Sequence, residues 1–77
     1  MALVEMTVAD ELLDRLPDAL PLLKARERDR QPATDHGYTI VTLEVDNAPA
    51  GARRVKPTFQ RTADGDIQLL TVTWYTD

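Results

Sequence analysis

Two cations and an aromatic residue in the second half of the chain have the types and spacing of a binding surface. Arg54 and Lys56 alternate along a segment that reads as a strand, so both side chains should leave the same face of it. Tyr75 lies opposite Arg54 if Asp64-Gly65 forms the turn of a hairpin between the last two predicted strands. Cations beside an aromatic ring can contact nucleic acid or an acidic protein surface. A solvated sheet face is the competing interpretation.

Three acids near the N-terminus form a second candidate surface. Asp10 and Asp14 are four residues apart, and Glu11 is three residues before Asp14, so a helix would place them together opposite its leucines. The simpler interpretation is a solvated helix face. The functional interpretation is an acidic contact surface that occupies a basic groove on a partner, because complementary potentials steer such encounters.

Residues for covalent or metal-assisted catalysis are missing or badly spaced. The chain contains neither serine nor cysteine, and most threonines fall in predicted strands, where they are ordinary β-formers. His36 is the sole histidine, and Asp35 beside it points elsewhere in most backbone geometries. Asp64 and Asp66 flank a glycine, as turn residues do. We therefore expect no enzyme activity, no cofactor and no bound metal.

Size and charge favour one small domain over residues 1–77. The net charge of −4 is unevenly distributed: residues 1–23 carry −4, residues 24–61 carry +3 and residues 62–77 carry −3. This layout is not that of a general nucleic-acid binder. No signal-peptide pattern and no apolar run of membrane-spanning length is present, so we expect a cytoplasmic protein. A homodimer remains open, since a chain of this size has a small core.

The pattern from about residue 8 to residue 30 predicts helix. Thr7 followed by Asp10 resembles a capping box, and leucines then recur at three- and four-residue spacing. Pro17 interrupts this pattern and predicts two helices, over about 8–16 and from about 19 onward, with one kinked helix as the alternative. The charged run 24–30 reads as a solvated helix end. Residues 2–6 are a weak candidate for a short extra strand.

The second half of the chain predicts three antiparallel strands, over 38–45, 53–62 and 67–76. Asp64-Gly65 reads as a two-residue hairpin turn and fixes the register of the last two strands. That register predicts the following facing pairs: Arg54 with Tyr75, Val55 with Trp74, Lys56 with Thr73, Pro57 with Val72, Thr58 with Thr71, Phe59 with Leu70, and Gln60 with Leu69.

Pro57 conflicts with a plain three-strand meander, because it cannot donate to a ladder. Either strand 53–62 lies at an edge, or it bulges near Pro57. The predicted fold is α+β, with one or two N-terminal helices packed on a three-stranded, or at most four-stranded, antiparallel sheet. Its predicted core consists of Leu12, Leu13, Leu16, Leu20, Leu23, Val41, Leu43, Val45, Val55, Phe59, Leu70, Val72 and Trp74.

These features favour a non-enzymatic protein-binding module. The leading interpretation is a small inhibitor of a macromolecular partner, such as a phage-encoded anti-CRISPR protein, an antitoxin or an immunity protein, blocking a basic nucleic-acid groove. The alternatives are a nucleic-acid-binding domain that uses the basic sheet face, and a structural subunit of a phage or another assembly. The expected contact residues are Asp10, Glu11, Asp14, Arg54, Lys56 and Tyr75.

Overall fold

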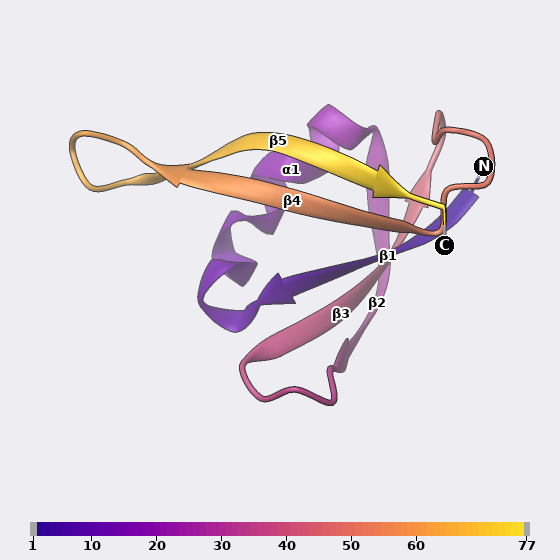
Figure 1. Cartoon of the computed structure of the whole chain (residues 1–77), viewed down its shortest axis with the longest axis horizontal. Coiled ribbons are helices and arrows are strands. Elements are labelled where there is room, and N and C mark those ends of the chain that lie inside the picture. The colour runs from indigo at the N-terminus through magenta and orange to yellow at the C-terminus, as the bar shows by residue number, and fades with distance from the viewer. Residues whose placement is uncertain (1, 77) are drawn as a thin grey trace.

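The computed structural model of the chain describes residues 2–76, which form an α+β fold with one five-stranded mixed sheet (Figure 1). The strand order across the sheet is β2-β3-β1-β4-β5. The elements are β1 (Ala2–Ala9), the 3₁₀ helix η1 (Asp10–Arg15), α1 (Leu16–Leu23), β2 (Ala25–Pro32), β3 (Tyr38–Val45), β4 (Arg54–Arg61) and β5 (Ile67–Tyr75).

The central strand is β1, which sequence reasoning treated as a short optional strand over residues 2–6. It pairs antiparallel with β3 along its whole length, from Ala2 opposite Val45 to Ala9 opposite Tyr38. It also pairs in parallel with β4. The expected three- or four-stranded antiparallel sheet is therefore wrong in strand number and in the direction of one pair. The missed signal is the alternation of buried Val4, Met6 and Val8 with exposed neighbours.

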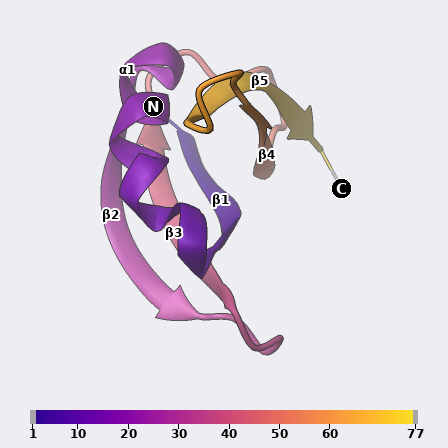
Figure 2. The same ribbon diagram turned by 90° about the vertical axis from the view of Figure 1, so that its left-hand side faces the viewer.

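The helical segment is shorter than its leucine pattern predicts. Residues 8 and 9 belong to β1, η1 follows at Asp10, and α1 begins at Leu16 with Pro17 in its first turn, where a missing N–H costs little. The helix ends at Leu23, and Lys24, with a positive φ of 52°, caps it. Figure 2 shows η1 and α1 lying over one face of the sheet.

Residues 24–30 were expected to be a solvated helix end, but only Lys24 caps α1, and residues 25–30 belong to strand β2. Five of the eight residues of β2 are charged, and the strand contributes almost nothing to the core. Pairing with β3 holds it in place. Bonds from Arg26 and Arg28 to Glu44 of β3 add to this pairing. Helix propensity is overridden because α1 stops at Leu23 and the chain must turn back.

The hairpin of β4 and β5 confirms most of the predicted register. Five facing pairs are as expected, from Arg54–Tyr75 to Thr58–Thr71. Beyond them a bulge shifts the ladder, so Phe59 faces Leu69, and the predicted Phe59–Leu70 and Gln60–Leu69 pairs are wrong. Leu70 is the extra residue of the bulge.

The tip of this hairpin is also longer than the predicted two-residue turn. The Thr62 N–H donates to the Asp66 carbonyl at 2.8 Å, and the Gly65 N–H donates to the Thr62 carbonyl at 3.0 Å. Three residues, 63–65, therefore lie between the paired residues Thr62 and Asp66. Gly65 has φ of +87°, which glycine adopts without strain.

The core lies between the helical layer and the inner faces of β1, β3 and β4. Six of the thirteen predicted core residues are buried, and Leu12, Leu13, Leu20, Val72 and Trp74 pack against them while partly exposed. Phe59 stays outside the buried cluster, and Leu70 is 56% exposed because the bulge turns it away. Residues 2–76 include no helix that could cross a membrane.

Substitutions at Met6 and Leu22 test this packing. Met6 is 0% exposed in the middle of β1, so we expect Met6→Ala to lower the free energy of unfolding by about 2–5 kcal/mol. Leu22 is 72% exposed, and Leu22→Ala should change it by less than about 0.5 kcal/mol. Urea unfolding followed by circular dichroism gives both values. Equal losses in the two variants would contradict the position of β1.

Candidate binding groove on the open sheet face

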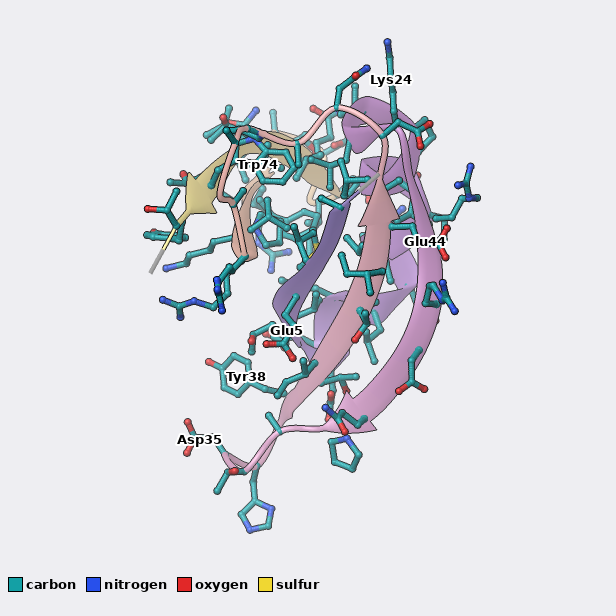
Figure 3. The ribbon with its side chains drawn as sticks, turned by 90° about the vertical axis from the view of Figure 1, so that its right-hand side faces the viewer. Glu5, Lys24, Asp35, Tyr38, Glu44 and Trp74 are labelled. Atoms are coloured by element: carbon teal, nitrogen blue, oxygen red, sulfur yellow. The ribbon has the colours of Figure 1, made fainter. Side chains whose placement is uncertain are left out.

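Within residues 2–76, one face of the sheet carries no helix, and we call it the open face. Because alternate residues of a strand point to opposite sides, the residues that alternate with the buried ones on β1, β3 and β4 point to this face. Its residues beside the β1–β4 junction are Leu3, Glu5, Thr7, Tyr38, Arg54, Lys56 and Tyr75. Figure 3 shows Glu5 on β1 and Tyr38 at the start of β3.

The pairing of β1 with β4 is restricted to Glu5–Arg54 and Met6–Val55, and we call this short parallel ladder the seam. The Glu5 N–H donates to the Arg53 carbonyl at 2.9 Å. In a parallel ladder that contains this bond, alternate residues of β4 donate their N–H groups to β1, and these residues are 55 and 57. Residue 57 is a proline and has no N–H. The ladder therefore ends beside Pro57.

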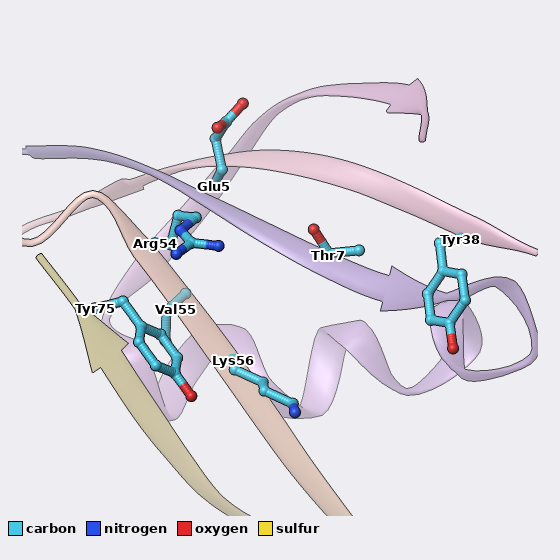
Figure 4. A pocket seen from close by; sticks show the side chains of 7 residues that line it. All are labelled: Glu5, Thr7, Tyr38, Arg54, Val55, Lys56 and Tyr75. Carbon is cyan, nitrogen blue, oxygen red and sulfur yellow. The ribbon is translucent and has the colours of Figure 1, made fainter. Parts of the chain in front are cut away.

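This position resolves the conflict that Pro57 posed in the sequence. Neither expected solution holds as stated, since β4 lies inside the sheet and the bulge belongs to β5. Pro57 is tolerated because its nitrogen faces the side of β4 where pairing has stopped. The two strands then diverge, as Figure 4 shows.

A groove of about 490 Å³ lies along the seam on the open face. Its lining residues come from four strands: Glu5, Thr7, Tyr38, Arg54, Val55, Lys56 and Tyr75. A smaller hollow continues from it between the diverging strands, past Pro57 and Phe59 to Leu12 of η1. Both hollows share Thr7, Tyr38 and Lys56. Together they form one extended depression, which we call the groove.

The structure brings together three residues that the sequence singled out. The Arg54 guanidinium carbon lies 5.6 Å from the centre of the Tyr75 ring, a cation–π arrangement between facing residues of β4 and β5. Lys56 stands two residues further along the same face, and it forms no ion pair within residues 2–76. This end of the groove is thus cationic and aromatic.

Sequence reasoning missed Glu5, Thr7 and Tyr38, which line the opposite wall of the groove. They were missed because β1 was not recognised as the central strand. Glu5 is the register partner of Arg54 across the seam, so the groove carries both signs of charge. Tyr38 is 47% exposed and Tyr75 is 40% exposed, which leaves a substantial part of each available for contact.

The three N-terminal acids lie on η1 and outside the groove. Asp10 accepts a hydrogen bond of 2.6 Å from the Thr39 hydroxyl, and its N–H donates to the Gly37 carbonyl, so it has a structural role. Glu11 and Asp14 are exposed. The expected acidic contact surface is therefore reduced to these two residues, and its binding role stays a prediction.

His36 and Asp35 are exposed in the loop between β2 and β3. Within residues 2–76 no group of three or more His, Asp or Glu side chains is arranged to hold a metal ion. The expected turn role of Asp64 agrees with its contacts: it accepts a bond from the Thr62 hydroxyl, which holds the pKa of its carboxyl below the ordinary value.

Part of the positive charge of the open face is already neutralised. Arg26 and Arg28 of β2 both donate to the Glu44 carboxylate, which is largely shielded from solvent. Hydrogen bonds from Arg28, and then from Arg26, hold the pKa of Glu44 below its ordinary value. These arginines are therefore less able to serve as a phosphate-binding track than their number in the sequence suggests.

Comparisons with known proteins add no functional information. No family description, curated protein sequence or solved structure matches this chain. Function must be argued from the groove itself.

The Glu44 contacts generate a prediction about acid titration. The Arg28→Gln change should raise the pKa of Glu44 towards its ordinary value, measured by carboxyl NMR titration. Arg30→Gln is the control, because Arg30 pairs with Glu27. Since the folded pKa is lowered, this contact stabilises the fold above the ordinary glutamate pKa, about 4.3, and is lost as the pH falls through the folded value. An unchanged Glu44 titration in Arg28→Gln would contradict the contact.

Proposed function

We propose that this protein is a non-enzymatic protein-binding module that seats a segment of a partner protein in the groove. The observation that carries the proposal is the open face itself, where a groove of mixed charge holds two half-exposed tyrosines and an arginine stacked on one of them. Tyrosine and arginine are enriched at the anchor positions of protein interfaces.

The charge pattern favours a protein over a polyanion. Glu5 lines the same groove as Arg54 and Lys56, and Glu44 neutralises the neighbouring arginines. A nucleic-acid surface is usually dominated by cations. A protein segment with one or two carboxylates and apolar side chains fits this pattern, because Lys56 offers an unpaired charge and the tyrosines offer apolar area.

The class of activity that follows is inhibition or sequestration by occupation of a partner surface. Small inhibitors of macromolecular complexes act in this way, among them anti-CRISPR proteins, antitoxins and immunity proteins. The proposal differs from the sequence-based expectation in its contact surface. The groove replaces the acids of η1 as the main site, since Asp10 is engaged by Thr39.

Single-stranded nucleic acid is the second candidate ligand. Arg54 stacked on Tyr75, with Lys56 beside it and Tyr38 across the groove, resembles a platform for stacked bases and their phosphates. The two candidates differ in salt response, because phosphate contacts release counterions and give a steep dependence.

An affinity experiment with matched variants tests the proposal. The tagged protein captures its partner from cell extract treated with nuclease, and the dissociation constant is then measured with the purified partner. We expect Tyr38→Ala and Tyr75→Ala each to weaken binding by about 2 kcal/mol, or roughly 30-fold. The change of Lys56 to Glu should also weaken it, while Thr58→Glu on the same face of β4, outside the groove lining, should not.

Three other results would point away from the proposal. Loss of capture with Glu11→Lys and Asp14→Lys, but not with the groove variants, would move the contact to η1. A parallel capture from extract without nuclease that retains nucleic acid, released by salt with a slope set by the phosphates contacted, would favour the second candidate. Binding that no groove variant weakens would reject the groove for both ligands. Circular dichroism of each variant verifies folding first.

A further inference from the structure

The two edges of the sheet are β2 and β5, and they differ sharply in composition. An edge strand exposes unpaired N–H and C=O groups, and proteins usually protect such edges with charges, prolines and bulges. β2 has all three devices: five charged residues out of eight, a register irregularity between Glu27 and Asp29, and Pro32 at its end.

β5 has almost none of this protection. Its nine residues, Ile67–Tyr75, include no charged residue, no proline and no glycine. Four are β-branched, and Leu70 is 56% exposed. The bulge at Leu70 distorts one point of the ladder with β4, but from Thr71 to Tyr75 the pairing with β4 is regular. This half of β5 is a regular strand with one edge unpaired.

The register shows which backbone groups of β5 face outward. The Tyr75 carbonyl accepts a bond of 2.9 Å from the Arg53 N–H, so residue 75 faces β4. Successive residues of a strand point their backbone N–H and C=O groups to opposite sides, so those of Thr73 and Thr71 also point towards β4. The backbone groups of Val72 and Trp74 point outward from the free edge of β5. Val72 and Trp74 thus offer N–H and C=O groups to a further strand.

We propose that β5 pairs with β5 of a second copy of this chain, antiparallel and about a two-fold axis near Val72. In this register Val72 faces Val72 of the copy, and Thr71 of each chain faces Thr73 of the other. The pairing satisfies the outward backbone groups and joins the two sheets into one.

Two observations favour a second copy over another occupant. The strand carries no charge, so pairing with itself brings no like charges together. The protected β2 edge also disfavours head-to-tail pairing of β5 with β2 of another copy, which would build open-ended fibres. An isologous β5 contact closes as a dimer, and a small chain gains stability from such a contact.

Charge pairs placed across the proposed axis test both the contact and its register. The variant Thr71→Glu with Thr73→Glu sets like charges opposite each other twice in the dimer. The matched variant Thr71→Lys with Thr73→Glu sets opposite charges there. Both variants place the same Glu opposite Lys56 within the chain. Thr58→Glu, on the same face of the interior strand β4, is the control.

Sedimentation velocity across a concentration series up to about 1 mM measures self-association. We expect a concentration-dependent dimer for the wild type and for Thr58→Glu. The Glu/Glu variant should raise the dissociation constant about tenfold or more, and the Lys/Glu variant should lie within about threefold of wild type.

A wild type that stays monomeric throughout would overturn the proposal. So would a dimer that the Glu/Glu variant leaves intact, because the contact would then lie elsewhere. Equal weakening in both charge variants would overturn the register, and growth beyond the dimer would overturn closure by β5. Circular dichroism of both charge variants must show wild-type folding before either is interpreted.

Discussion

The seam between β1 and β4 is the constraint on which the rest of the structure depends. It joins two otherwise separate antiparallel units, β2-β3-β1 and the β4–β5 hairpin, through two residue pairs. The same short ladder sets the direction of β4 relative to β1. It also buries Met6 and Val55 under the helical layer. Because Pro57 ends the ladder, the strands diverge and the groove opens beside it.

The parts of the fold that rest on local chemistry could be predicted from the sequence. Gly65 marks the hairpin tip, and alternation along residues 54–58 and 71–75 sets their register. The parts that rest on pairing between distant segments could not. β2 reads as a helix end because its strand state depends on β3, and a parallel β1–β4 pair has no local signature.

The residues of the candidate site also separate into those that local chemistry places and those that distant pairing places. Arg54, Lys56 and Tyr75 were within reach because they belong to the hairpin, and the hairpin alone brings them together. Glu5, Thr7 and Tyr38 join them only through the seam. The acids of η1 were chosen on a helical spacing, but the segment is a 3₁₀ helix in which Asp10 serves the fold.

The groove and the β5 edge together describe a small binding protein with a simple geometry. Antiparallel pairing about an axis perpendicular to the sheet keeps both helical layers on one side and both open faces on the other. A dimer of this kind would present two grooves in the same direction, each with its tyrosines and Lys56. Such a pair could engage a partner at two points and gain avidity without any new contact.

Native-state hydrogen exchange at the seam tests the central claim most directly, because it reports whether the ladder between β1 and β4 stops at Pro57. The N–H of Glu5 donates to Arg53 and should exchange slowly. The N–H groups of Ala9 and Phe59, which face the gap where β1 and β4 diverge beyond the seam, should exchange orders of magnitude faster. If Ala9 and Phe59 are as strongly protected as Glu5, the ladder continues past Pro57, and β1 and β4 do not diverge to open the groove.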